Sequence, residues 1–408
     1  MSYKIDRLDD FGRGVTSING KTCFVSNALV NEDVELVIEK EKSKFSEGKT
    51  TKIINKSEQR KELECPYFYE CGGCNIMHMN YDAQLDFKKK KVEGVLSRFA
   101  GINNIVKEIT PSKEFIYRNK VTLKVKDGKL GYFKDKSYNL VSIDKCLLCR
   151  GIINETIRKL NELTLNNIEE VIIRSNDENE VLLCLKGNDI DKEYFKDKLD
   201  KVENIVVIDN GIKEIIKGKD YIIDKINDLS FKVSVESFFQ VNSFAVTDLY
   251  NKALEYANLT GNENVLDLYC GTGTIGMFLS KNAKNVFGVE INESAVKDAN
   301  YNKELNNISN IEFLCSDVGL VKNDFKDVDL VVIDPPRAGL GENAIKNILD
   351  INPKMIVYVS CDPVTLARDL NILKNNYDIK EITAVDMFPN TYHIESVAVL
   401  IKKWKYNL

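Results

Sequence analysis

The residues best suited to covalent chemistry lie near the C-terminal end of the chain. Cys361 ends the apolar run MIVYVSC, and Asp362-Pro363 then begins a helical pattern. A thiol beside a helix N-terminus is expected to have a lowered pKa, which makes Cys361 a candidate nucleophile. Glu395 lies at the start of the last apolar run. If that run is an antiparallel strand at the edge of a sheet, the Glu395 carboxylate reaches the same rim and can act as a general base.

A glycine-rich loop supplies a second candidate site. It follows the apolar run NVLDLYC and contains Asp267, Gly271 and Gly273. The glycines let the backbone approach a ligand closely, whereas the Asp267 carboxylate would repel a pyrophosphate and tolerate a sulfonium. Glu290, at the end of the next apolar run, can accept hydrogen bonds from both hydroxyls of a ribose. This combination favours S-adenosylmethionine over a dinucleotide.

Two further acids end apolar runs of the same kind. Asp317 ends IEFLCSD and can reach an adenine amino group, although aspartate is also a common helix cap. Asp334 leads the sequence Asp-Pro-Pro-Arg337. The paired prolines make a stiff loop that can hold the Asp334 carboxylate against a flat base and the methyl donor.

Together these groups predict one reaction. Carbon 5 of uracil is a poor nucleophile, but addition of a thiolate to carbon 6 makes carbon 5 enolate-like, so that it can attack a methyl group. A base must then remove the proton from carbon 5 before the thiolate can leave. Cys361 is predicted to add to the ring, and Glu395 is predicted to remove the proton.

Three cysteines near the N-terminal end have the spacing of metal ligands. Cys65, Cys71 and Cys74 lie within ten residues, and two glycines separate the last two. The chain shows no secretory signal and no apolar run of membrane length, so we expect a cytoplasmic protein whose ten cysteines are not disulfides. Cys146 or Cys149 could be the fourth ligand. The unequal spacing favours a four-iron cluster over a zinc site.

Charge is distributed unevenly along the chain. Residues 65–150 carry 16 lysines and arginines against 9 acidic residues, whereas residues 151–408 carry 29 against 41. A basic segment beside an acidic one is typical of a polyanion-binding part joined to a part with another task. The runs 88–91 and 117–120 are candidate phosphate contacts, although each of these charges alone is more often solvated.

The first 237 residues of the chain predict antiparallel structure. Residues 1–58 contain short alternating runs with a turn at Asn19-Gly20, which is typical of a small β-barrel of the OB type. Residues 59–237 are predicted to form a mixed, hairpin-rich α+β domain, with one turn at Asp127-Gly128 and a helix with a basic face at 80–99.

The remaining residues, 238–408, alternate apolar strands with helices. The helices are expected at 272–282, 293–306, 341–350 and 363–375. This alternation predicts an α/β domain with a doubly wound, mainly parallel sheet. In such sheets ligands bind beyond the carboxyl ends of the strands, where nearly all the candidate residues fall.

With these motifs the sequence resembles the RNA uracil-C5 methyltransferase family, and within it the iron–sulfur branch that modifies 23S ribosomal RNA. The resemblance covers essentially the whole chain, including a TRAM-type barrel over 1–58. Its motifs are CPYFYECGGC at 65–74, SFFQVN at 237–242, DLYCGTG at 267–273, DPPR at 334–337, VSCDPVTLARD at 359–369 and HIES at 393–396.

The resemblance implies a Rossmann-like methyltransferase domain and a role for each motif. Cys361 would be the nucleophile and Glu395 the base in methylation of a 23S ribosomal RNA uridine, with Phe238 near the target base. The positions implied for S-adenosylmethionine are Gln240, Tyr269, Thr274, Glu290, Asp317 and Asp334. The positions implied for a [4Fe-4S] cluster are Cys65, Cys71, Cys74 and Cys146, with Cys149 as the alternative fourth ligand.

Three other functions stay open at this point. The same chemistry on the T-loop uridine of transfer RNA is the nearest, and cytosine-C5 methylation is less consistent with the residues around Cys361. A non-catalytic iron–sulfur RNA-binding protein is the third. For catalysis the uridine must lie in a loop or be flipped out of a helix. We expect a monomer that binds RNA, with no DNA or membrane partner.

Overall fold

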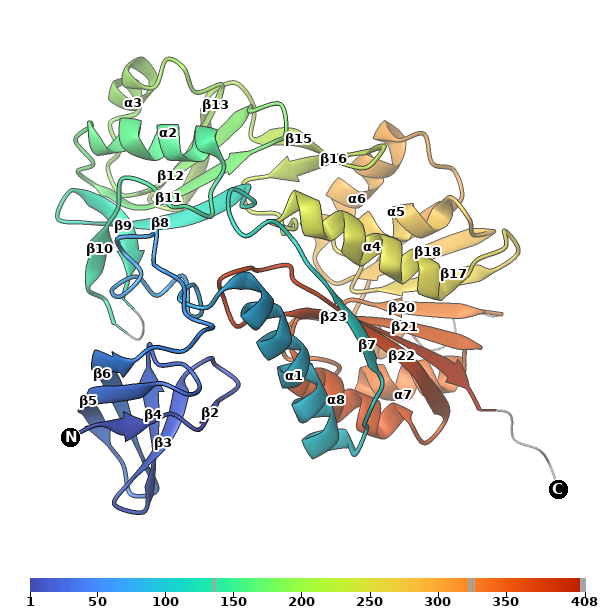
Figure 1. Cartoon of the computed structure of the whole chain (residues 1–408). Helices are drawn as coiled ribbons and strands as arrows, with labels where there is room; N and C mark the ends of the chain where they lie inside the picture. Colours follow the sequence, from blue (N-terminus) through green and yellow to red (C-terminus); the bar gives the residue numbers. More distant parts are fainter. Residues whose placement is uncertain (135–136, 322–324, 326, 404–408) are drawn as a thin grey trace.

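The computed structural model describes residues 1–134, 137–321, 325 and 327–403. Within these residues the strands form sheets of six, seven, two and eight strands (Figure 1). No helix in the described ranges is long and apolar enough to cross a membrane.

The six-stranded sheet comprises the N-terminal residues. Its strands are β1 (Tyr3–Lys4), β2 (Arg7–Leu8), β3 (Gly14–Ile18), β4 (Lys21–Ser26), β5 (Asp33–Glu41) and β6 (Phe45–Asn55), in the order β1-β5-β6-β4-β3-β2. The hairpin turn predicted between β3 and β4 is confirmed, with positive φ angles of 51° at Asn19 and 77° at Gly20. The sheet curls, because the Asp6 amide beside β1 donates to the Val15 carbonyl oxygen of β3. Its assignment as a TRAM or OB barrel stays a prediction.

The N-terminal sheet packs on the segment that follows it. Leu29 and Ile76 share a buried cluster with Met79 and Phe87. Gly12 lies so close to this cluster that a Cβ atom there would stand 2.4 Å from the Ile76 side chain. Residues 1–58 are therefore packed against residues 65–79, which contain Cys65, Cys71 and Cys74 and are called the cysteine segment below.

The seven-stranded sheet contains the predicted hairpins. Its order is β10-β9-β8-β11-β12-β13-β14, and the turn between β8 and β9 at Asp127-Gly128 is confirmed by positive φ angles at both residues. Helices α2 and α3 pack on one face in a single core cluster. The elements are β8 (Lys120–Lys126), β9 (Lys129–Phe133), β10 (Leu140–Ser142), β11 (Ile168–Ser175), β12 (Val181–Gly187), β13 (Asn204–Asp209), β14 (Ile212–Lys217), α2 (Gly151–Asn161) and α3 (Lys192–Lys198).

The eight-stranded sheet is the doubly wound sheet that the sequence predicts. Its order is β19-β18-β17-β20-β21-β23-β22-β7, and among these described strands only β23 runs antiparallel to its neighbours. The strands are β7 (Val106–Thr110), β17 (Asn264–Leu268), β18 (Asn285–Glu290), β19 (Ile311–Cys315), β20 (Leu330–Ile333), β21 (Met355–Ser360), β22 (Tyr377–Val385) and β23 (Glu395–Lys402).

Helices cover both faces of this sheet (Figure 1). The helices α4 (Ser243–Ala257), α5 (Thr274–Ser280) and α6 (Glu293–Leu305) lie on one face. The helices α1 (Tyr81–Ala100), α7 (Glu342–Ile351) and α8 (Pro363–Leu373) share a core cluster on the other. A 3-10 turn, η1 (Val318–Leu320), follows β19. The helices predicted from the sequence are thus confirmed to within a few residues.

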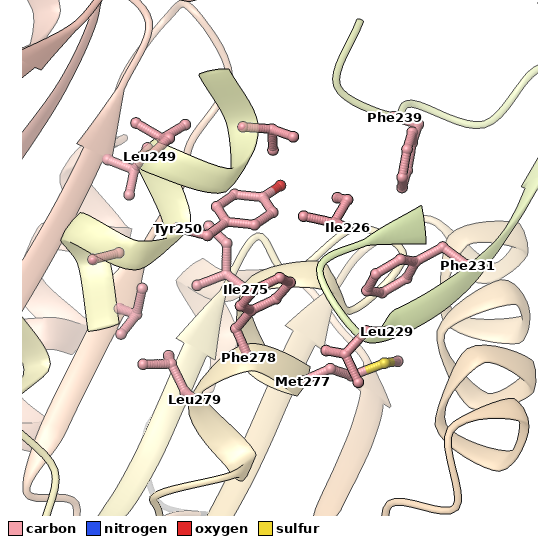
Figure 2. Close-up of a cluster of buried hydrophobic side chains, with 14 of the residues drawn as sticks. Ile226, Leu229, Phe231, Phe239, Leu249, Tyr250, Ile275, Met277, Phe278 and Leu279 are labelled. Atoms are coloured by element: carbon pink, nitrogen blue, oxygen red, sulfur yellow. The ribbon is translucent and has the colours of Figure 1, made fainter. Parts of the chain in front are cut away.

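A two-stranded hairpin, β15 (Tyr221–Ile226) and β16 (Leu229–Ser234), joins the seven-stranded sheet to the eight-stranded one. The Ser230 amide donates to the Asn306 side chain, which ties the hairpin to the end of α6. Figure 2 shows the apolar contacts among the hairpin, α4 and α5, made by Ile226, Leu229, Phe231, Phe239, Leu249, Tyr250, Ile275, Met277, Phe278 and Leu279. This core fixes Phe239 and therefore the residues on either side of it.

Three features of the sheet differ from the expectation. The last strand, β23, is antiparallel as predicted, but it is not at the edge, because β22 and β7 lie beyond it. Both additional strands mix charged and apolar residues, so neither has the uniformly apolar sequence of a buried strand. Helix α1 and β7 belong to the predicted central domain, yet they pack with the C-terminal sheet. The domain boundaries themselves stay a prediction.

Candidate active site

Cys361 and Glu395 meet at one end of the eight-stranded sheet. Strands β21 and β23 pair with Ser360 opposite Ser396, so the next rung of the ladder brings Cys361 opposite Glu395. The Glu395 side chain is buried, and that of Cys361 is half-buried. The structure therefore brings the two predicted catalytic residues together at the carboxyl end of β21.

The pKa of Cys361 is raised, and the prediction of a lowered value was wrong. Burial raises the pKa of the Cys361 thiol to about 12, and the acids Glu395 and Asp334 add to the increase, while Arg337 lowers it. The N-terminus of α8 does little to lower the pKa of Cys361, because the Asp362 carboxylate already accepts hydrogen bonds from the first amides of that helix. A raised pKa favours the protonated thiol at neutral pH.

Glu395 also holds its proton more tightly than an ordinary carboxyl. Burial raises the pKa of Glu395 well above its usual range, Asp334 raises it further, and Arg337 lowers it. Because a carbon-bound proton is hard to remove, a base with a raised pKa suits the predicted role.

The glycine-rich loop opens α5 at the carboxyl end of β17. Asp267 is fully buried, and neither of its carboxylate oxygens has a hydrogen-bond partner within the described residues. Burial raises the pKa of Asp267 to about 8, with Asp334 adding to the increase. An orphaned, buried acid beside a glycine loop fits a cationic ligand such as a sulfonium.

Glu290 and Asp317 lie at the ends of the neighbouring strands β18 and β19. The Glu290 carboxylate accepts hydrogen bonds from the amides of Gly271 (3.1 Å) and Asn292 (2.8 Å), which orient it beside the glycine loop. Asp317 caps η1 by accepting from the Gly319 amide at 2.7 Å. The capping role considered for Asp317 is therefore present, and its contact with adenine stays a prediction.

The remaining positions expected to bind S-adenosylmethionine lie around the same loop. Tyr269 has a positive φ of 62° at the end of β17. The Thr274 hydroxyl lies 3.1 Å from the Tyr250 hydroxyl, and Gln240 is largely buried. Burial raises the pKa of Asp334 to about 7. Their roles as ligand contacts stay predictions, as do the roles of Glu290 and Asp317.

Two residues near the catalytic pair had no role assigned from the sequence. Arg337 is exposed, and its charge lowers the pKa of both Cys361 and Glu395. Burial lowers the pKa of His393 to about 4, and Arg337 lowers it further. The sequence signal for both was their position in the motifs DPPR and HIES, next to residues already selected.

Four cysteines surround one cavity between the cysteine segment and the seven-stranded sheet. Its volume is about 30 Å³, its wall is mainly apolar, and it is lined by Cys65, Cys71, Cys74 and Cys146 together with Arg118 and Tyr132, among others. Among the described residues, no group of three or more His, Cys, Asp or Glu side chains has the spacing to hold a metal ion. The four thiols are therefore not close enough together to hold a single metal ion, and they line a cavity between them.

The wall of this cavity leaves polar groups without partners. Arg118 Nε and the Tyr132 hydroxyl are buried, and neither has a hydrogen-bond partner in the described part of the chain. Cys149 does not line the cavity, but its thiol donates to Cys146 and lowers the pKa of Cys146 to about 6. Soft thiol ligands with an arginine cation beside them fit a negatively charged thiolate-bound cluster.

Three of the eight candidate phosphate contacts are buried and so are not available to RNA. Lys88 is completely buried and pairs with Asp386, so its prediction as a phosphate contact was wrong. Tyr117 and Asn119 are buried as well. Phe238, by contrast, is 74% exposed, as an aromatic that stacks on a target base must be. Its role stays a prediction.

Comparisons with known proteins agree with this arrangement. A family model described as tRNA (uracil-5-)-methyltransferase matches residues 80–403. An uncharacterized RNA methyltransferase of Halalkalibacterium halodurans is 36% identical over 98% of this chain and 96% of the relative, and one of Clostridium acetobutylicum is 37% identical over 98% and 96%.

A solved structure is similar over the whole chain. The Pyrococcus abyssi tRNA (uracil-54, C5)-methyltransferase in complex with S-adenosyl-L-homocysteine superposes with a TM-score of 0.81 at 30% identity. The alignment covers 98% of this chain and 100% of that one, so it includes the N-terminal sheet and the cysteine segment.

Proposed function

This chain belongs to the tRNA (uracil-5-)-methyltransferase family, and we propose that it methylates carbon 5 of an RNA uridine with Cys361 as nucleophile and Glu395 as base. The observation that carries the proposal is the pairing of β21 with β23, which brings this thiol and this carboxyl together at the end of the sheet where the glycine-rich loop follows β17. S-adenosylmethionine, when bound at that loop, supplies the methyl group as a sulfonium.

The residues of the chain divide the reaction into two halves. In the first, the Cys361 thiol loses its proton to solvent, its sulfur bonds to carbon 6 of the uracil ring, and the electron pair of the C5=C6 bond moves toward carbon 5. Carbon 5 then accepts the methyl group, while the bond between that methyl group and the donor sulfur breaks and leaves its electron pair on the sulfur. The charge of Arg337 favours the thiolate that this step requires.

In the second half Glu395 accepts the proton from carbon 5. The electron pair of that C–H bond re-forms the C5=C6 bond, and the carbon–sulfur bond breaks with its electrons returning to Cys361. The product is 5-methyluridine, and the thiol site is free for another turnover.

Trapping experiments test these roles. RNA with 5-fluorouridine at the target should give a covalent complex that survives a denaturing gel, because fluorine cannot leave as a proton does. Cys361→Ala should abolish the complex, whereas Cys184→Ala, in the seven-stranded sheet, should form it. A wild-type enzyme that methylates RNA without forming the complex would contradict the proposed chemistry.

Glu395→Gln separates the two halves of the reaction. The general base contributes about 10²–10⁴-fold to the rate, so kcat should fall by that factor. Because ring addition and methyl transfer come first, methylated covalent adduct should accumulate on ordinary uridine RNA, measured with radiolabelled methyl donor. Loss of activity without adduct would place Glu395 outside the elimination step.

We propose 23S ribosomal RNA as the substrate, because the sequence motifs resemble those of the iron–sulfur branch that modifies it. The T-loop uridine of transfer RNA is the second candidate, because the P. abyssi enzyme named for tRNA uracil-54 aligns with the whole chain. Methyl transfer to purified, unmodified 23S ribosomal RNA and transfer RNA, measured side by side, distinguishes the two. The monomeric state stays a prediction.

We also propose that Cys65, Cys71, Cys74 and Cys146 hold a [4Fe-4S] cluster, whose role is to cross-link the segments that carry them. The support is the cavity that the four thiols enclose and the unpartnered Arg118 Nε at its wall. Protein purified without oxygen should be brown and contain about four irons per chain. Cys146→Ala should lose the iron and Cys149→Ala should keep it; a colourless, zinc-containing protein would overturn the assignment.

A further inference from the structure

The loop that carries the base is held by side chains from distant parts of the chain. Residues 386–394 form this loop between β22 and Glu395. The buried Lys88 of α1 donates to the Phe388 carbonyl oxygen at 2.9 Å, and the Asn242 amide donates to the Met387 carbonyl oxygen at 2.9 Å. The position of Glu395 therefore depends on contacts from outside its own strand.

Asn390 lies at the centre of these contacts. It is fully buried, and its φ of 68° is in the left-handed region. Its backbone amide donates to Gln84 Oε1 at 2.8 Å, and its side-chain oxygen accepts from Gln84 Nε2 at 3.1 Å. Its side-chain nitrogen donates to the Glu114 carbonyl oxygen at 2.8 Å. Every polar group of this residue is used in binding other segments.

The carbonyl oxygen of Asn390 binds the cysteine segment. It accepts hydrogen bonds from the backbone amides of Asn75 (3.0 Å) and Ile76 (3.2 Å). These two residues directly follow Cys74, which lines the four-cysteine cavity. One residue thus lies between the wall of that cavity and the catalytic base, which is five positions further along the chain.

A second contact joins the same two regions. The buried Tyr117 hydroxyl donates to the Pro389 carbonyl oxygen at 3.1 Å. Tyr117 immediately precedes Arg118, which lines the cysteine cavity. Both residues 389 and 390 are therefore tied to segments that form the cavity wall.

We propose that Asn390 is a positioning residue that couples the four-cysteine cavity to the catalytic base Glu395. The proposal rests on the proposed function in that it takes Glu395 as the base of the elimination step. An ordered cysteine segment fixes the positions of Asn75 and Ile76, whose amides donate to the Asn390 carbonyl oxygen. Asn390 in turn fixes the loop 386–394, which directs the Glu395 carboxylate toward the proton on carbon 5.

The coupling acts on one half of the reaction. Cys361 is positioned by β21 and by the capped start of α8, and neither contacts Asn390 through a hydrogen bond among the described residues. Disturbing Asn390 should therefore slow proton removal by Glu395 more than ring addition by Cys361.

Two variants of Asn390 test this step. Asn390→Asp keeps the shape of the side chain but replaces the donor that faces the Glu114 carbonyl oxygen. Asn390→Gly removes the side chain and tolerates the positive φ, so its fold is the safer of the two. Asn352→Gly is the matched control, since Asn352 is an exposed residue with a φ of 57° at the end of α7.

Accumulation of covalent adduct distinguishes a positioning role of Asn390 from a general loss of stability, which would not cause adduct to accumulate. With ordinary uridine RNA, methylated covalent adduct should accumulate in both Asn390 variants, as in Glu395→Gln, but not in Asn352→Gly. A displacement of about 1 Å can cost about 10²-fold, so kcat should fall by about that factor while KM for RNA stays within about twofold.

Amide hydrogen exchange tests the link to the cavity without measuring activity. In the full-length protein, Cys74→Ser should speed exchange across residues 386–394, because the amides that hold Asn390 follow directly. Cys315→Ser, at an exposed thiol at the end of β19, should leave that exchange unchanged.

Three results would overturn the coupling. They are unchanged kcat in the Asn390 variants, loss of kcat without covalent adduct, and unchanged exchange of 386–394 in Cys74→Ser. Failure of the proposed function is distinguishable, because it would appear in the wild-type enzyme as the absence of any complex with 5-fluorouridine RNA.

Discussion

Acidic groups dominate the residue-scale chemistry of the site. Burial raises the pKa of Asp267 to about 8 and that of Asp334 to about 7, and it raises the pKa of Glu395 as well. In the folded protein these acids hold protons that an unfolded chain releases above about pH 4. Their contribution to stability is therefore present at low pH and lost as pH rises through about 7 to 8. If S-adenosylmethionine binds at these acids as proposed, we expect its sulfonium to offset that loss by pairing with the ionised forms.

This arrangement predicts pH-dependent discrimination between the methyl donor and its neutral product. As pH rises from about 6 to about 9, Asp334 and Asp267 ionise, and affinity for S-adenosylmethionine should rise by about tenfold relative to S-adenosylhomocysteine. Calorimetric titration of both ligands measures the ratio. Asp334→Asn should flatten its pH dependence, and an equal ratio at both ends of the range in wild type would contradict the prediction.

The sequence predicted where Cys361 and Glu395 would lie better than it predicted their electrostatics. Both residues lie in motifs at the ends of apolar runs, and the strand register brings them together. The pKa of Cys361 was predicted in the wrong direction, because burial and the nearby acids exceed the effect of a helix N-terminus that Asp362 already caps. The net pKa shift depends on distances between side chains in the folded protein, and the spacing of residues along the sequence does not give these distances.

At the scale of elements, α1 differs most from its predicted role as a helix with a basic face. Its bounds agree with the predicted helix at 80–99, but the lysines in its basic run have different environments. Lys88 is buried against Asp386, whereas Lys90 pairs with Asp86 on the exposed side of the helix. Four consecutive lysines cannot all face solvent on a helix that packs on a sheet, and the sequence alone does not reveal which one turns inward.

Lys88→Met should destabilise the protein strongly. It leaves the Asp386 carboxylate buried without its partner, which costs about 3–5 kcal/mol of unfolding free energy, measured by urea denaturation. Lys90→Met breaks an exposed pair and should cost less than about 1 kcal/mol. Equal effects of the two substitutions would show that the buried pair does not hold α1 to the loop. The double variant Lys88→Met/Asp386→Leu should recover most of the loss.

At the scale of the whole molecule, the sequence predicted the kinds of structure better than the contacts between them. The small N-terminal sheet, the hairpins and the doubly wound sheet are each encoded by local patterns. The pairing of β7 with β22 and the contacts of Asn390 join residues hundreds of positions apart. No local pattern marks such contacts, which is why they emerge only from the folded chain.

Glu32→Gln tests how firmly the N-terminal sheet is attached. Glu32 is fully buried, and its carboxylate pairs with Arg60, which lies between that sheet and the cysteine segment. Leaving Arg60 without its buried partner should cost about 3–5 kcal/mol. Glu41→Gln, which breaks an exposed pair with Lys21, should cost less than about 1 kcal/mol. Thermal and urea unfolding of both variants measure the difference, and a negligible effect of Glu32→Gln would mean a loosely attached sheet.

The close approach of Gly12 to Ile76 limits how this protein can be recombined with its relatives. A chimera that exchanged only residues 1–58 would join two surfaces shaped independently, and any side chain that the exchanged piece carried at position 12 would collide with Ile76. The interchangeable unit extends through Met79, so the N-terminal sheet and the cysteine segment should be inherited, or transplanted, as one piece.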